Sequence, residues 1–270
     1  MARHHSLKTN AQSGFTLAEM AIVLVIVGLL VAVVVGGSSL LQQSKLQTAI
    51  ADYSKYSAAV AQFTRQYGGP PGDIIDATNY WGKDTANCNA DSAAAGSPGT
   101  CNGDGNGVIG SNASSSEMFR AWQQLQLAKM VDGTFSGTAS SNATVFGTNA
   151  PASRILNAGW GFFNNTSYTG NADWYAQDVS NVLMLGSTTL LSTYIAGNTL
   201  PVGPVLTPTE AWQIDKKMDD GLPASGRIVA LKPTSSGTPN CTTSATDASA
   251  AYNRTLTTAE CNLNFSLTLK

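Results

Sequence analysis

The sequence predicts an α+β protein, in which one long N-terminal helix precedes a globular head with an antiparallel β-sheet. Three patterns predict this fold: an apolar run over residues 15–37, an apolar helical stripe over 38–67, and short β-type runs between Gly/Ser/Asn turns within 68–270. Apolar residues that recur every three or four positions indicate one face of a helix, whereas alternation indicates a strand. We therefore expect a helix whose first half is transmembrane and whose second half is amphipathic, followed by the head.

The run from Phe15 to Gly37 is long enough to cross a membrane. As a helix it measures roughly 35 Å, and the hydrocarbon core of a bilayer is about 30 Å thick. No charged residue occurs from Met20 to Ser44, so the polar face of a soluble core helix is missing. Arg3 and Lys8 precede the run without an acid, and positive flanks stay in the cytoplasm. We expect a single membrane pass with a cytoplasmic N-terminus and an exported head.

One acid, Glu19, lies near the start of this run. A carboxylate near the middle of a membrane costs on the order of 2–3 kcal/mol on insertion scales, and such a charge is a functional hypothesis by default. The expected offset is a positive partner held nearby. Two alternatives are a signal-anchor helix whose acid reaches the membrane edge, and a secretory signal cleaved near the small residues Gly36-Gly37-Ser38-Ser39.

The hexapeptide Gly14-Phe15-Thr16-Leu17-Ala18-Glu19 opens the apolar run and resembles the processing site of type IV pilins and type II secretion pseudopilins. The resemblance implies that residues 1–14 are a leader, that a prepilin peptidase cuts after Gly14, and that the new amine of Phe15 is methylated. In a filament, Glu19 of one subunit would then meet the Phe15 amine of its neighbour. This attraction is strong in low dielectric, and an unmatched stagger would leave a buried charge alone.

The helix is expected to continue beyond the membrane as far as Tyr67, where Gly68-Gly69-Pro70-Pro71 ends it. The family resemblance implies the same plan, a long helix packed under a globular head. The loop at Pro71-Gly72-Asp73 is similar to one that follows the long helix in a subset of large pilin-like proteins. The apolar stripe steps by three and four residues alternately and consists of Leu46, Ala49, Tyr53, Tyr56, Val60, Phe63 and Tyr67.

Several shorter elements are expected in the head. Ser114-x-x-Glu117 is a capping-box pattern, which predicts a helix with Met118, Trp122 and Leu125 on its apolar face. A second short helix is expected from residue 211 into the turn at 219–221. Strands are expected at 182–185, at 188–195, within 226–231 and at 261–269.

The four cysteines are Cys88, Cys101, Cys241 and Cys261, and three pairings are open to them. The local pairing, Cys88 with Cys101 and Cys241 with Cys261, is favoured because it closes short loops in Gly/Ser/Thr-rich segments. None of the four forms a Cys-x-x-Cys motif, so zinc or redox chemistry is not indicated. In an oxidising compartment these residues act as structural disulfides.

Calcium is the one cofactor that the sequence suggests. Asn102, Asp104, Asn106 and Val108 copy the opening of a calcium loop, although Ala113 stands where the closing acid belongs. A glycine/asparagine turn beside a disulfide is the alternative for this segment. The second candidate is the acid group Asp215, Asp219 and Asp220, for which a solvated turn with Asp215 as a cap is the alternative.

The composition argues against enzymes and nucleic-acid binders. Charged residues are 12% of the chain, the net charge is −2, and no basic patch occurs. The only histidines, His4 and His5, lie in the leader. We expect a non-enzymatic filament subunit that first lies in the lipid of a bacterial inner membrane and then polymerises with pilin-like subunits. It would need a prepilin peptidase/methylase and an inner-membrane assembly platform, and would end in a surface pilus or a periplasmic pseudopilus. The other hypotheses are a membrane-anchored surface adhesin and an anchored hydrolase.

Overall fold

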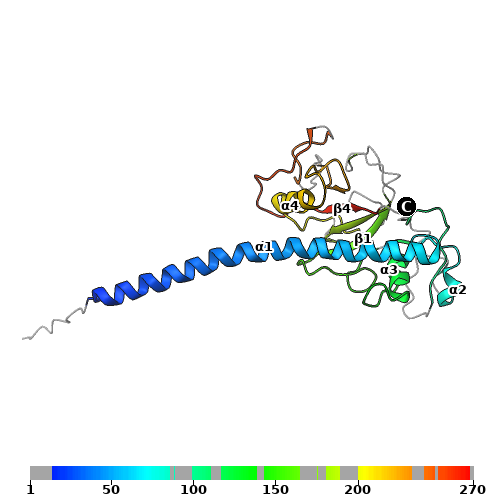
Figure 1. Ribbon diagram of the computed structural model, residues 1–270, viewed down its shortest axis with the longest axis horizontal. Coiled ribbons are helices and arrows are strands. Elements are labelled where there is room, and N and C mark those ends of the chain that lie inside the picture. The colour runs from blue at the N-terminus through cyan, green and yellow to red at the C-terminus, as the bar shows by residue number, and fades with distance from the viewer. Residues whose placement is uncertain are drawn as a thin grey trace, which may run out of the picture. The chain divides into compact units, whose positions relative to one another are not determined.

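The chain divides into two compact units, Met1–Ser44 and Lys45–Lys270. The computed structural model (Figure 1) describes residues 14–85, 88, 99–110, 117–138, 143–164, 175, 181–188, 200–232, 240–246 and 249–267, with the backbone alone for 33–41. Each unit is described by itself below. Helix α1, Leu17–Tyr67, belongs to both of them.

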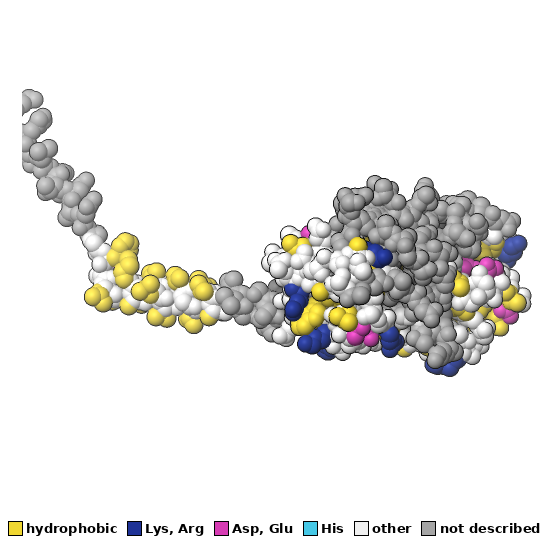
Figure 2. Space-filling view, turned by 90° about the horizontal axis from the view of Figure 1, so that it is seen from above, with side chains coloured by type: hydrophobic (Ala, Val, Ile, Leu, Met, Phe, Trp, Pro, Cys, Tyr) yellow, Lys and Arg dark blue, Asp and Glu magenta, His cyan; other side chains and the backbone are white. Residues whose placement is uncertain are grey.

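In the first unit, the described apolar side chains of α1 are exposed. Large hydrophobic residues between Phe15 and Val31 are exposed, and Figure 2 shows apolar side chains along this segment. Among the described residues, no helix has both the length and the apolarity that a membrane crossing needs. The transmembrane half of the prediction over residues 15–37 is therefore not confirmed.

In the second unit, α1 buries the apolar stripe that the sequence predicted. The buried members are Ala49, Tyr53, Tyr56, Val60 and Phe63, each at most 7% exposed. Leu46 and Tyr67 are partly buried against the same core. The helix ends at Tyr67 because Gly68 takes φ 81° and Pro70 has no backbone N–H with which to continue it.

The sheet has four antiparallel strands in the order β1-β2-β4-β3, which confirms the α+β prediction. Its strands are β1 Gly159–Asn164, β2 Asn181–Gly186, β3 Ile228–Val229 and β4 Leu263–Ser266. The register pairs Phe162 with Leu183, Leu183 with Phe265, and Phe265 with Ile228. These apolar side chains therefore share one face of the sheet.

Helices α1 and α3, Glu117–Leu127, pack on that face. Tyr53 of α1 stacks on Phe265 with ring centroids 4.8 Å apart. Tyr56 meets Trp122 of α3 at 5.0 Å, and Trp122 meets Phe162 of β1 at 4.4 Å. Aromatic side chains thus join both helices to the sheet, beside which they lie in Figure 1.

Two further helices complete the head. Helix α2, Ala77–Trp81, places Trp81 at 5.1 Å from the Tyr67 ring at the end of α1. Helix α4, Pro208–Met218, begins in a capping box between Thr207 and Glu210. The strand expected within 226–231 is only the two residues of β3. Most of the strand expected at 188–195, and Ser114 of the expected capping box, lie outside the described residues.

Candidate functional site

The processing motif lies at the junction between irregular chain and α1. Gly14, Phe15 and Thr16 are not helical, and α1 begins at the next residue, Leu17. The Phe15 side chain is 80% exposed. The bond between Gly14 and Phe15 therefore lies in exposed, non-helical chain just before the helix.

Thr16 and Glu19 form a capping box at the start of α1. The Glu19 N–H donates to Thr16 Oγ1 at 3.2 Å. Glu19 Oε2 in turn accepts the Thr16 N–H at 2.8 Å and the Thr16 hydroxyl at 2.8 Å. This exchange satisfies backbone donors that every helix N-terminus leaves open. Sequence reasoning missed this role of Glu19, although the spacing Thr-x-x-Glu was a readable signal for it.

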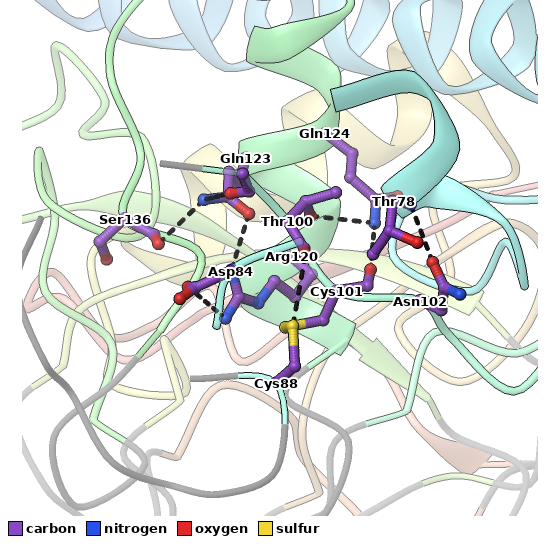
Figure 3. Close-up of a disulfide and its surroundings, with 11 residues drawn as sticks. Thr78, Asp84, Cys88, Thr100, Cys101, Asn102, Arg120, Gln123, Gln124 and Ser136 are labelled. Carbon is purple, nitrogen blue, oxygen red and sulfur yellow. Dashed lines mark hydrogen bonds and ion pairs between the residues drawn. A yellow bond between two sulfur atoms is a disulfide. The ribbon is translucent and has the colours of Figure 1, made fainter. Parts of the chain in front are cut away.

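Two disulfides join Cys88 to Cys101 and Cys241 to Cys261, which is the local pairing favoured by the short loops. Figure 3 shows the first of them beside α3. The Gln124 amide donates to the Cys101 carbonyl at 3.0 Å, and Gln124 Oε1 accepts the Gly72 N–H at 2.6 Å. Gln124 therefore holds both the disulfide segment and the loop after α1 against α3.

A buried ion pair lies in the same region. Arg120 of α3 donates to Asp84 at 3.0 Å, and their side chains are 2% and 1% exposed. Figure 3 shows that Gln123, which accepts a hydrogen bond from Arg120 at 2.9 Å, also reaches toward Ser136. Burial lowers the pKa of Arg120, and Asp84 opposes that effect. This pair is a structural contact between α3 and the chain before Cys88.

The first calcium candidate gathers three acids that are far apart in the sequence. Carboxylate oxygens of Asp73, Asp104 and Glu117 lie within 4.8 Å of one another. Asp73 follows α1 in the Pro-Gly-Asp loop, and Glu117 is the first residue of α3. Sequence reasoning left Asp73 and Glu117 out of the site, because nothing in the spacing of the calcium-like loop indicates acids from outside it.

The four residues predicted for this site are placed differently from a complete calcium loop. Asp104 joins the acid group, whereas Asn102 Oδ1 accepts the Thr78 N–H at 2.8 Å and so faces α2 (Figure 3). Asn106 Oδ1 accepts the Val108 N–H at 2.7 Å. Of the four predicted ligands, Asp104 is the acid that belongs to the cluster, and the Asn106 side-chain amide donates to Asp104 Oδ2 at 2.9 Å.

Backbone N–H groups already bind the acids of this cluster. The Asp73 carboxylate accepts from Gly105 at 2.9 Å, Asn106 at 3.1 Å and Gly107 at 2.8 Å. Burial raises the pKa of Asp73, and burial raises the pKa of Glu117 to about 7. A cavity of about 250 Å³ lies beside Asp73 and is also lined by Tyr67 and Asp76. The cluster thus brings three carboxyl groups together where two loops meet the start of α3.

The second acid group, Asp215, Asp219 and Asp220, has its oxygens within 4.8 Å of one another as well. Asp215 is fully buried in α4, so the alternative of a solvated turn is wrong for it. Asp215 accepts the Tyr252 hydroxyl at 2.7 Å and the Gly221 N–H at 3.1 Å. Burial raises the pKa of Asp215 to about 7, against the effect of those two hydrogen bonds.

The other two acids of this group hold the turn after α4. Asp219 Oδ2 accepts the N–H groups of Arg227 and Ile228, the latter at 3.1 Å, and so ties the end of α4 to β3. Asp220 accepts the Ser225 hydroxyl at 2.7 Å. All three carboxylates therefore have structural partners within the protein.

Comparison with known proteins identifies the N-terminal segment. Residues 9–35 match the prokaryotic N-terminal methylation motif, which is the signature of type IV pilins and pseudopilins. Neither the curated proteins nor the solved structures contain a match to the chain. The motif implies processing by a prepilin peptidase and assembly with pilin-like subunits.

Proposed function

We propose that this chain, which carries the N-terminal methylation motif of type IV pilins and pseudopilins, is a structural subunit of a type IV pilus-like filament. The peptidase cuts after Gly14 and methylates the Phe15 amine. The membrane holds the apolar start of α1 until assembly, when that segment packs against the same segment of other subunits. The match over residues 9–35 is the observation that carries this proposal.

The exposed apolar side chains at the start of α1 support the proposed role as a filament subunit. Apolar side chains between Phe15 and Val31 are exposed along α1, and burying them in a filament would contribute about 25 cal/mol per Å². Glu19 is the acid of this segment, and its pairing with the Phe15 amine of a neighbour would set the stagger between subunits. A carboxylate without that partner would be costly to bury.

Substitution of Glu19 tests the proposal in cells that assemble the filament. Glu19→Ala is expected to keep membrane insertion and to abolish incorporation into sheared filaments, which electron microscopy and mass spectrometry of the subunits would measure. Absence of the native chain from sheared filaments would contradict the proposed filament subunit and would favour an anchored adhesin. Normal incorporation of Glu19→Ala would overturn only the proposed Glu19 contact. N-terminal sequencing of the mature chain should begin at Phe15, and any other start contradicts the proposed processing.

Calcium binding remains a separate proposal, now centred on Asp73, Asp104 and Glu117. Their crowded carboxylates are the hard oxygen ligands that Ca²⁺ takes. Calcium would then raise the unfolding temperature of the native chain, and Asp104→Asn would reduce that increase. Isothermal titration without heat of binding at millimolar Ca²⁺ would exclude this site.

A further inference from the structure

The Glu19 carboxylate is held asymmetrically. Both hydrogen bonds that it accepts, from the N–H and the hydroxyl of Thr16, end on Oε2. An ionised carboxylate has two oxygens with about four acceptor sites in total. Among the described residues, no hydrogen bond to Glu19 Oε1 occurs, so that oxygen keeps its capacity to accept a donor.

The capping box does not depend on the leader. Its donors and acceptors belong to Thr16 and Glu19, and cleavage after Gly14 would alter only the nitrogen of Phe15. Thr16 keeps its peptide N–H and its hydroxyl in both the precursor and the mature chain. The arrangement that holds Oε2 can therefore persist when the Phe15 amine appears.

We propose that Thr16 is a positioning residue for the contact between subunits. It fixes the Glu19 side chain through Oε2 and leaves Oε1 for the methylated amine of a neighbouring subunit. A glutamate side chain that is already ordered loses less rotamer freedom when it binds, so the contact forms more readily. This inference rests on the proposed filament function.

Four variants of the full-length precursor separate the cap from the charge. Thr16→Ser keeps the hydroxyl, and Thr16→Val keeps the shape of the side chain without it. Glu19→Gln keeps a capping-box acceptor but loses the charge, and Glu19→Ala loses both. Assembly is scored only on chains whose N-terminal residue is Phe15, so that changes in cleavage do not enter the comparison.

We expect Thr16→Val to incorporate into filaments about five-fold less than the native chain, the factor that loss of an N-cap typically gives. Thr16→Ser should restore incorporation, and Glu19→Gln should fail although its cap is intact. In detergent micelles, the Glu19 backbone amide should exchange its hydrogen faster in Thr16→Val than in Thr16→Ser, which reports the cap directly.

Two results would overturn the inference while leaving the filament function in place. One is native incorporation of Thr16→Val, and the other is a Thr16→Ser variant that fails as Thr16→Val does. Normal incorporation of both Glu19 variants would instead overturn the proposed Glu19 contact itself. The thermal unfolding of the head serves as a control for folding in each variant, because the buried core of the described chain begins at Ala49.

Discussion

Several individual acids of the head are held by hydrogen bonds from within the protein. Asp73 binds three backbone N–H groups of one loop, Asp219 binds two at β3, and Asp215 lies fully buried against Tyr252. A buried carboxylate is stable only with partners of this kind. Where the burial outweighs the partners, as for Glu117 and Asp215, the pKa rises to about 7.

The raised pKa of Asp215 predicts a dependence of stability on pH. The folded protein binds this proton more tightly than the unfolded chain does, because the pKa rises on folding from its ordinary value of 3.8 to about 7. The free energy of unfolding should therefore fall as the pH rises from about 4 to about 7, by on the order of a few kcal/mol for this residue. Urea unfolding at several pH values measures that slope.

Asp215→Asn should remove its share of the slope, because an amide can still bond with Tyr252 and Gly221 but does not titrate. The exposed Asp132, which pairs with Lys55 at 2.9 Å, provides a control, and Asp132→Asn should leave the fall in stability between pH 4 and 7 in place. An unchanged slope in Asp215→Asn would show that the carboxyl of Asp215 does not gain its proton on folding.

At the scale of the secondary-structure elements, two helices of this chain begin with the same kind of capping box. The capping boxes of α1 and α4 both have a threonine followed three residues later by a glutamate. In α4, Glu210 Oε2 accepts the Thr207 N–H at 2.8 Å and also the Lys45 ammonium at 2.9 Å. One acid thus closes the helix start and ties α4 to α1 within the head.

Substitutions at α4 separate these two contributions. Thr207→Ala should lower the free energy of unfolding by about 1 kcal/mol, since a helix loses its cap, and Thr207→Ser should recover most of that loss. Glu210→Gln keeps a cap acceptor but loses the charge that Lys45 needs, and a partly exposed ion pair contributes about 0–1 kcal/mol. Denaturant titration measures these changes. If Thr207→Ser lowered the free energy of unfolding as much as Thr207→Ala, the capping role of Thr207 would be contradicted.

At the scale of the whole molecule, the two units differ in where the buried core and the exposed apolar side chains lie. Every buried core residue of the described chain lies at or after Ala49, within Lys45–Lys270, and both disulfides lie there too. The first unit presents exposed apolar side chains and the methylation motif. The second unit therefore contains the described core, whereas in the proposed filament the first unit would make the contacts between subunits.

A chain shortened to Lys45–Lys270 should unfold at the same denaturant concentration as the full chain, because it keeps the whole described core. A chain that begins at Gly68 should fail to fold cooperatively, because it lacks Tyr53, Tyr56 and Phe63 of α1. Circular dichroism during denaturation compares the two. A large drop in midpoint for the first truncation would mean that residues before Lys45 stabilise the head.

Patterns local in the chain were readable from the sequence alone. The methylation motif, the stripe of α1 and its end at Gly68 rest on neighbouring residues, and for such patterns the helical period fixes which side chains share a face. The same holds for the capping box of Thr16 and Glu19, which the spacing contained although its meaning was missed.

The acid clusters could not be read in this way, because folding brings together residues that no local period relates. Asp73, Asp104 and Glu117 come from three separate segments of the chain. Asp215 accepts a hydrogen bond from Tyr252, which lies 37 residues later in the sequence. The burial of Asp73, Glu117 and Asp215, and with it the raised pKa of each, depends on how α1, α3 and α4 pack on the sheet. Order along the chain thus determines the helix and its processing signal, whereas packing in three dimensions determines the environment of each buried charge.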